Sequence, residues 1–120
     1  MNISMSTFLT KRELVLLALY RMTAGDTCSR VPRNSLIVES WKLDKKKMGL
    51  REYWYDYPDS NTVIVLLTSR RLASEEQKRN SLLDSQKIVR HDDGTYSITH
   101  LGIEEAIKLE NKYSMTKGQT

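Results

Sequence analysis

Residues 86–108, which read QKIVRHDDGTYSITHLGIEEAIK, decide the fold. Two short runs rich in β-branched residues flank an Asp-Gly pair, a pattern that is typical of a β-hairpin. A helix-like pattern follows directly. Because a two-stranded hairpin is barely stable alone in water, this one must pack on other elements. We therefore predict a mainly α fold with a small antiparallel hairpin at 87–99, which belongs to the α+β class.

The turn determines which hairpin side chains face the rest of the protein. With Asp93 and Gly94 as a two-residue loop, four cross-strand pairs follow: Asp92 with Thr95, His91 with Tyr96, Arg90 with Ser97, and Val89 with Ile98. Side chains alternate between the two faces of a strand, so Val89 and Tyr96 would face the helices. Arg90 would then point outward.

Capping signals and apolar periodicity predict helices over 11–24, 33–46, 60–70, 75–84 and 101–113. The first helix opens on a capping box from Thr10 to Glu13 and is apolar on nearly all sides. Pro32 favours the start of the second helix, and the sequence SEEQ at 74–77 is a capping box for the fourth. The first helix should therefore form the centre of the core.

The segment 60–70 is the hardest to assign. Residues 62–68 are rich in β-branched side chains and are compatible with a buried strand. However, the sequence PDS at 58–60 is a strong helix-entry signal, and a strand here would have only the hairpin to pair with. We therefore predict a helix, with Val63, Leu66 and Leu67 facing inward.

Four aromatic residues are crowded into 53–57. Such rings could stack on unpaired nucleobases, or they could anchor the loop on the core while their polar ends stay in water. The flanking Glu52, Asp56 and Asp59 would repel a nucleic-acid backbone. We therefore favour anchoring.

The composition predicts a single globular domain. The chain has 120 residues, of which 39% are hydrophobic and 28% are charged. We expect one domain over 1–120, with an ordered core at about 8–113 and a flexible tail at 114–120. The single cysteine, Cys28, leaves no partner for an internal disulfide and suits a reducing compartment. Because the longest early apolar run is too short to cross a bilayer, we expect a cytoplasmic protein.

Positive charge is concentrated in the middle of the chain. The net charge is +4, and residues 30–91 carry thirteen basic and eight acidic side chains, against three and five in residues 92–120. Such asymmetry suits an anionic partner on one face, although a solvated basic surface would give the same count.

The sequence gives little support for catalysis. Cys28, His91 and His100 are scattered, and the chain has no CxxC, HExxH, GxSxG or glycine-rich phosphate motif. Asp92 and Asp93 are adjacent, but such pairs before a glycine are typical turn formers. We therefore expect no enzymatic activity, no metal and no cofactor.

In its order of elements the chain resembles the winged helix-turn-helix proteins, in which helices precede a two-stranded wing. The resemblance covers about 10–113, and its motif is the end of the wing, where Tyr96, Ile98, Thr99 and Gly102 match the family pattern. It implies a small transcriptional regulator that binds double-stranded DNA sequence-specifically. Because winged helices also bind proteins, the alternative is an interaction module whose basic face binds an acidic partner.

The resemblance leaves two assignments of the recognition helix open. In the family this helix runs almost directly into the wing, whereas here 75–84 intervenes. Either 60–70 is the recognition helix, or 60–70 and 75–84 form the helix-turn-helix across 71–73. The carboxylates of Glu75 and Glu76 would meet phosphates unfavourably, which favours the first assignment.

On the first assignment, the base-reading residues would be Ser60, Asn61, Thr62, Val65 and Ser69. Asparagine can bind adenine bidentately, and valine or threonine methyls can contact the thymine methyl. The phosphate and wing contacts would come from Lys45, Lys46, Lys47, Arg70, Arg71, Lys87 and Arg90. The three lysines and the two adjacent arginines could equally stabilise the C-terminal ends of their helices.

The last predicted helix suggests a dimer. Its apolar stripe consists of Ile103, Ala106, Ile107 and Tyr113, and only part of it should pack within one chain. Leftover apolar surface beside the first helix favours a homodimer through 101–113 and the first helix. The competing interpretation is that this helix seals its own core, with Leu101 and Leu109 as minor contacts.

Overall fold

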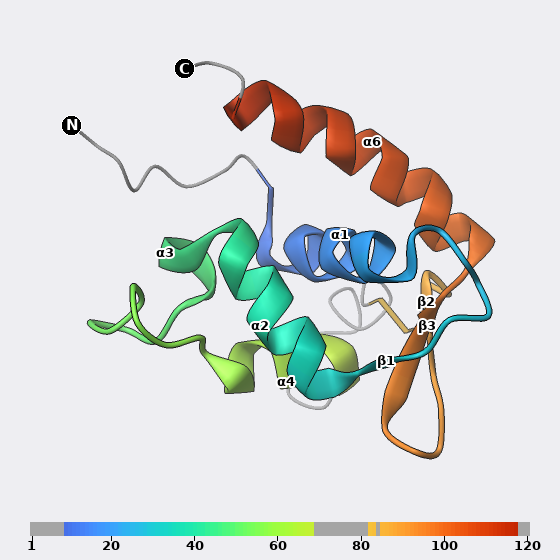
Figure 1. Ribbon diagram of the computed structural model, residues 1–120, viewed down its shortest axis with the longest axis horizontal. Helices are drawn as coiled ribbons and strands as arrows, with labels where there is room; N and C mark the ends of the chain where they lie inside the picture. The colour runs from blue at the N-terminus through green and yellow to red at the C-terminus, as the bar shows by residue number, and fades with distance from the viewer. Residues whose placement is uncertain (1–8, 69–81, 84, 118–120) are drawn as a thin grey trace.

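The structure is a computed structural model that describes residues 9–68, 82–83 and 85–117, with the backbone alone for residues 68 and 115–117. In chain order its elements are α1 Lys11–Thr23, β1 Val31–Pro32, α2 Arg33–Leu43, α3 Lys45–Met48, α4 Ser60–Thr68, β2 Ile88–Arg90, β3 Thr95–Ile98 and α6 His100–Lys117. The described part of the chain is a mixed α+β fold with a small antiparallel sheet (Figure 1), which confirms the predicted class.

Helix α1 forms the centre of the core, as predicted. The Thr10 hydroxyl accepts from the amide of Glu13, and the Glu13 carboxylate accepts from the amide of Thr10, so the capping box is complete. All six side chains from 14 to 19 are buried. The helix lies between α6 on one side and the pair α2 and α4 on the other (Figure 1), so it is covered on nearly all sides.

The second helix begins after Pro32 as predicted but ends at Leu43 rather than at 46. The break lies at Asp44, whose backbone leaves the helical region with φ −155° and ψ 88°. Its carboxylate accepts a hydrogen bond from the amide of Lys47 at 3.0 Å and so caps the short helix α3. The three lysines 45–47 therefore do not sit in the last turn of α2, and that prediction is wrong.

Helix α4 confirms the helical assignment of its segment over Ser60–Thr68. The Asp59 carboxylate accepts from the amide of Thr62 at 3.3 Å and from its hydroxyl at 2.9 Å, which caps the helix. Val63 and Leu67 are buried, and Leu66 packs partly against the core.

The predicted helix 75–84 falls almost entirely on residues outside those that the structure describes. Only 82 and 83 of its positions are described. Leu82 is buried and Leu83 is half-buried, but both lie in a turn and not in the predicted helix.

The hairpin forms, but its register differs by one residue from the prediction. Ile88 pairs with Ile98, Val89 with Ser97, and Arg90 with Tyr96. The loop has three residues, because His91 donates its amide to the Thr95 carbonyl at 2.9 Å and Gly94 takes a left-handed φ of 83°. A shift of one residue exchanges the faces of a strand, so Ile88 is 3% exposed and Val89 is 42% exposed.

A third strand, β1, completes the sheet in the order β1-β3-β2. It has two residues, with Val31 opposite Tyr96 and Pro32 opposite Thr95. Proline is tolerated here because β1 is an edge strand. The sequence analysis did not predict this strand, since two residues are too few to show an alternating pattern.

Helix α6 begins after Thr99, whose hydroxyl accepts from the amide of Gly102 at 3.1 Å. Its buried face is formed by Ala106, Leu109 and Tyr113, whereas Ile107 is 49% exposed. The predicted apolar stripe is therefore wrong at Ile107 and at Leu109. The backbone stays helical to residue 117, so the expected tail at 114–120 overlaps the end of α6.

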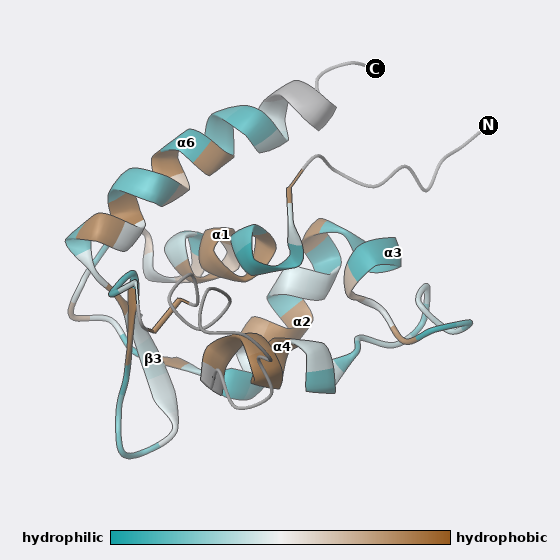
Figure 2. Ribbon diagram, turned by 180° about the vertical axis from the view of Figure 1, so that it is seen from behind, coloured by the Kyte–Doolittle hydropathy of each residue, from teal (hydrophilic) through white to brown (hydrophobic). Residues whose placement is uncertain are grey.

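The apolar residues are concentrated where the elements meet. Figure 2 shows α4 as mostly hydrophobic and α6 as alternating between hydrophobic and hydrophilic residues. Among the helices of the described ranges, none combines the length and the apolar character needed to cross a membrane.

An ion pair joins the end of α1 to α6. The Arg21 guanidinium contacts both carboxylate oxygens of Glu110, with Nε to Oε2 and Nη2 to Oε1 both at 2.8 Å. It also lies 4.9 Å from the ring centre of Tyr113. The hydrogen bond from Arg21 is the main reason that the pKa of Glu110 lies below its ordinary value. A lowered pKa means that the pair stabilises the fold above the ordinary pKa of glutamate and that this contribution disappears as the pH falls through the lowered value.

We expect Glu110→Gln to lower the free energy of unfolding by about 0.5–1 kcal/mol at neutral pH, a modest value because both side chains are partly exposed to screening by water. At an acidic pH below the lowered pKa of Glu110 the cost should largely vanish, since the carboxyl group is then protonated in the parent protein as well. Urea unfolding at the two pH values measures the difference. Glu104→Gln, an exposed position on the same helix, serves as the control. An equal cost of Glu110→Gln at both pH values would show that the ion pair is not the cause.

Candidate nucleic-acid interface

A groove of about 620 Å³ runs between the start of α2, the exposed side of α4 and the hairpin. The residues that line it are Pro32, Arg33, Asn34, Ile64, Arg90, His91, Asp92, Asp93, Gly94 and Tyr96. Helix α4 and the hairpin tip lie along the same edge of the molecule, on the side away from α6 (Figures 1 and 2). The groove therefore joins an exposed helix to a projecting hairpin and is lined by two guanidinium groups.

The side of α4 that is not buried presents Asn61, Ile64 and Val65. Asn61 is exposed, and its side chain forms no hydrogen bond with any residue that the structure describes. Ile64 and Val65 are half-buried, and Ile64 lines the groove. Ser60 is exposed at the first turn. Three of the predicted base-reading residues, Ser60, Asn61 and Val65, thus lie on the accessible part of the helix.

The other two predicted base-reading residues are Thr62 and Ser69, and neither is shown on this accessible side. The Thr62 hydroxyl donates to the Asp59 carboxylate, so it belongs to the helix cap and its donor is already used. Ser69 lies outside the described residues, as do Arg70 and Arg71 of the predicted phosphate contacts.

Arg90 lines the groove because of the observed register. It lies opposite Tyr96 and shares that residue's face of the sheet, whereas the predicted register placed the two on opposite faces. Its exposed guanidinium therefore joins Arg33 and Ile64 along the same groove.

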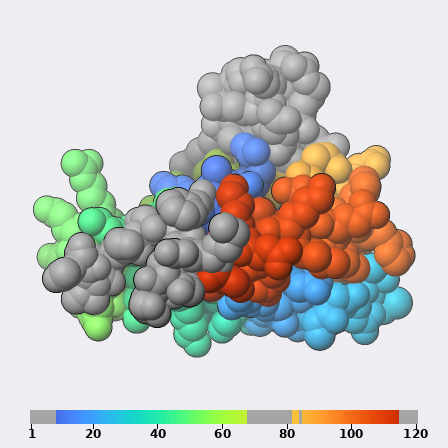
Figure 3. Space-filling view, turned by 90° about the horizontal axis from the view of Figure 1, so that it is seen from above, coloured from blue at the N-terminus to red at the C-terminus, as the bar shows by residue number. Residues whose placement is uncertain are grey.

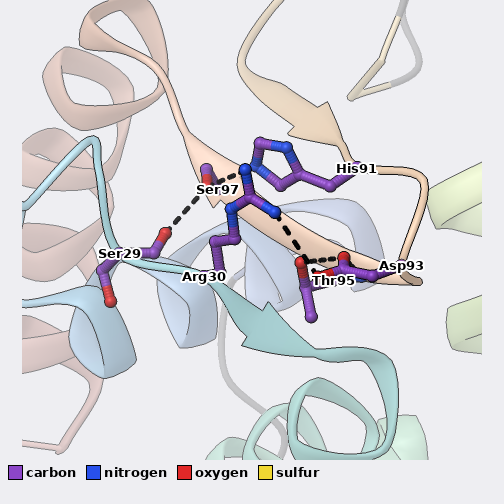
Figure 4. A network of polar contacts seen from close by, with 6 residues as sticks. All are labelled: Ser29, Arg30, His91, Asp93, Thr95 and Ser97. Carbon is purple, nitrogen blue, oxygen red and sulfur yellow. Dashed lines mark hydrogen bonds and ion pairs between the residues drawn. The ribbon is translucent and has the colours of Figure 1, made fainter.

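Polar contacts tie the hairpin tip to the chain before β1 (Figure 4). The Ser97 hydroxyl donates to the carbonyl of Ser29 at 2.7 Å and lies 2.8 Å from Nε2 of His91. Since the Ser97 proton is directed at Ser29, Nε2 of His91 acts as the donor to Ser97. The network leaves the other ring nitrogen of His91 out of this contact and fixes the imidazole beside the groove.

Asp93 shapes the tip itself. Its carboxylate accepts from the amide of Thr95 at 3.1 Å and from its hydroxyl at 2.6 Å, and it lies 3.4 Å from the guanidinium of Arg30. The hydrogen bonds from Thr95, followed by the charge of Arg30, hold the pKa of Asp93 below its ordinary value. Asp93 is thus a charged turn former, as the sequence predicted, and Arg30 offsets its charge at the edge of the groove.

The structure does not bring the predicted lysines to this groove. Lys87 lines a separate pocket with Thr10 and Glu105, at the base of the hairpin. The Lys45 ammonium lies 4.8 Å from the ring centre of Trp41. Lys47 donates to the carbonyl of Leu9. Lys46 is exposed on α3.

The sequence analysis missed Arg33 and Asn34, which line the groove from the first turn of α2. They come directly after the two-residue strand β1, and it is the pairing of β1 with β3 that brings them beside Arg90. No local signal marks that pairing. An arginine directly after a helix-starting proline is only a weak hint.

The aromatic segment does not anchor on the core as predicted. Tyr53, Tyr55 and Tyr57 are 61%, 66% and 57% exposed. Only Trp54 is half-buried, and its carbonyl accepts from the indole N–H of Trp41 at 2.7 Å. The anchoring prediction is therefore wrong for the three tyrosines.

Within the ranges that the structure describes, no group of three or more histidine, cysteine, aspartate or glutamate side chains is placed to hold a metal ion. Comparisons of the chain with protein-family models, with curated proteins and with solved structures gave no match.

Proposed function

We propose that the chain binds double-stranded DNA in a sequence-specific manner as a winged helix-turn-helix protein, with α4 in the major groove and the β2–β3 hairpin as the wing. The observation that carries the proposal is the groove in which the exposed side of α4 meets Arg33 and Arg90. The major groove of B-DNA is about 12 Å wide and admits one α-helix. A helix that lies at the edge of the molecule, with cations beside it, suits this entry.

The order of elements supports the same assignment. Helix α2, helix α4 and the hairpin follow one another in the chain, and α4 and the hairpin tip share an edge (Figure 1). The Asp59 carboxylate caps α4. Ser60 and Asn61 are exposed at the same end of the helix, which is the end that would approach DNA. These contacts support the assignment of 60–70 as the recognition helix.

The residues at the groove divide into those that can contact DNA bases and those that can bind phosphates. The Asn61 amide can bind adenine bidentately, and the methyl groups of Ile64 and Val65 can contact a thymine methyl. Arg33 and Arg90 line the same groove as Ile64 and can bind phosphates.

A transcriptional regulator of this type would act as a homodimer, and α6 is the surface that supports this part of the proposal. The apolar side chains from 14 to 19 of α1 are buried within one chain, so Met22, at 38% exposed, is the one large apolar side chain of α1 that is exposed to a second copy. Helix α6 leaves Leu101 and Ile107 about half exposed and lies across the face shown in Figure 3. Pairing through this face would leave the α4 edge free for DNA.

The alternative function, an interaction module for an acidic protein, is favoured by one feature. Ile64 presents apolar surface in the same groove as Arg33 and Arg90, a combination that an acidic amphipathic segment could also occupy. Replacing Asn61 distinguishes the two functions, because only the reading of DNA bases requires its side-chain amide.

Asn61→Ala should reduce discrimination between a selected duplex and a random duplex by about 2 kcal/mol, or roughly thirty-fold, with little loss on the random duplex. Selection from a randomised duplex library followed by binding titrations measures both affinities. Asn111→Ala, at an exposed position on α6, is the matched control. Equal losses on the two duplexes would remove Asn61 from base reading. A loss confined to Gln77→Ala would assign that role to 75–84 instead.

A further inference from the structure

The loop 50–57, here called the tyrosine loop, exposes more aromatic surface than any other described segment. Tyr53, Tyr55 and Tyr57 are each more than half exposed, and Leu50 is 40% exposed. The loop projects at the end of the molecule opposite the hairpin (Figures 1 and 3). Exposed apolar groups gathered in one place are typical of interaction surfaces.

The backbone of the tyrosine loop is already fixed. At its base the amide of Leu50 donates to the carbonyl of Tyr57 at 3.0 Å, and the amide of Asp59 donates to Met48 at 2.9 Å. Within the loop the amides of Tyr53 and Tyr57 donate to the carbonyls of Leu50 and Tyr53, both at 3.0 Å. Rings presented on a fixed backbone lose little conformational entropy on binding, as in the tyrosine-rich surfaces of binding proteins.

The charge of the loop identifies the partner. Glu52 and Asp56 are exposed among the tyrosines and outnumber the single cation Arg51, in a chain whose net charge is +4. Carboxylates at this position would repel the phosphates of a nucleic acid. They would attract arginine or lysine side chains, and tyrosine rings bind the same groups through their faces.

One contact within the chain already shows this chemistry. The ammonium group of Lys45 lies between two rings, 4.8 Å from the centre of Trp41 and 5.0 Å from the centre of Tyr55. Tyr53 and Tyr57 form no such contact with a cation among the described residues. Their rings are therefore open to a cation from outside.

We propose that the tyrosine loop is a docking surface for a second protein that presents arginine or lysine side chains. Tyr53 and Tyr57 bind the cationic side chains, and Glu52 and Asp56 supply the complementary charge. The proposal rests on the tyrosine loop and does not use the groove beside Arg33 and Arg90, on which the DNA-binding proposal rests.

The test uses the full chain and a fluorescent peptide of alternating arginine and serine, followed by anisotropy. A peptide of the same length with glutamate in place of arginine and a single-stranded oligothymidylate serve as comparators. The arginine peptide should bind to the loop despite the positive net charge of the chain. Tyr53→Ser combined with Tyr57→Ser should weaken it about ten-fold.

Two further variants define the origin of the binding. Glu52→Gln with Asp56→Asn keeps the rings, and it should weaken the arginine peptide and reduce the salt dependence of its binding. Val38→Ser removes an exposed apolar group from α2 and should leave the affinity unchanged. Circular dichroism of each variant confirms that it folds.

Three results would overturn the proposal. The arginine peptide could bind no better than the glutamate peptide, or equally well to the tyrosine variant. The tyrosine variant could instead lose binding to oligothymidylate, which would make a nucleic acid the occupant. Finally, it could lose self-association in sedimentation, which would make a second copy of the chain the occupant.

Discussion

Replacing Gly102 with alanine should destabilise the protein by about 3 kcal/mol. A Cβ atom at this position would lie 2.2 Å from the carbonyl oxygen of Lys87 and 2.8 Å from Cγ1 of Ile98. Both neighbours are fixed, because the Lys87 carbonyl accepts from the amide of Thr99 at 3.1 Å and Ile98 is buried. Since alanine is the better helix former, a loss of stability must come from the steric clash alone.

The matched control is Gly94→Ala at the hairpin tip. No atom lies within 4 Å of a Cβ placed there, but the φ of 83° disfavours alanine, so we expect a cost of about 1 kcal/mol. Denaturant unfolding of both variants gives the comparison. If Gly102→Ala were as stable as the parent protein, α6 would not pack against the base of the hairpin as described.

This packing explains why the end of the hairpin carries its sequence pattern. Tyr96 and Ile98 are buried, Thr99 caps α6, and Gly102 allows the helix to approach the Lys87 carbonyl. The pattern is thus the local requirement for joining a hairpin directly to a helix.

The second large effect concerns DNA. Arg33→Ala combined with Arg90→Ala should weaken binding to every duplex by about thirty-fold at low salt. The slope of log affinity against log salt should also become shallower by about two, because each phosphate contact contributes about 0.9. These two guanidinium groups line the groove beside α4 and are its accessible cations.

Lys87→Ala combined with Lys108→Ala removes the same charge from elsewhere. Lys87 lies in a separate pocket and Lys108 is exposed on α6, so affinity should fall far less. Equal losses for the two double variants would show that binding depends on net charge and not on the groove.

The helices could be predicted because their signals are local. The capping box of α1 and the Pro-Asp-Ser entry of α4 lie within the segments that they start, and both formed. The end of α2 could not be predicted, since Asp44 forms a cap for α3 only once the chain has turned there.

The hairpin register could not be predicted from the sequence, for a related reason. An Asp-Gly pair suits both a two-residue and a three-residue loop. The bonds from Thr95 to Asp93 accompany the longer loop, and this choice moves Ile88 to the buried face. The same choice places Arg90 on the face of Tyr96 and hence in the groove.

The candidate site was predicted in part. Asn61 and Val65 lie on the accessible side of α4, as the helical period indicated. Arg33 and Asn34 were missed because a pairing of β1 with β3 over two residues brings them to the groove. The lysines 45–47 were assigned from charge alone, but Lys45 and Lys47 are engaged by aromatic rings and by a backbone carbonyl.

The most direct test of the proposed function is the affinity of the full chain for duplex DNA over a range of salt concentrations. If Arg33 and Arg90 each bind a phosphate, affinity for any duplex should fall by at least about ten-fold between about 50 and 200 mM salt, and a selected sequence should keep its preference throughout. An affinity that stays within about two-fold over this range, or no measurable binding at the lowest salt, would contradict the DNA-binding function.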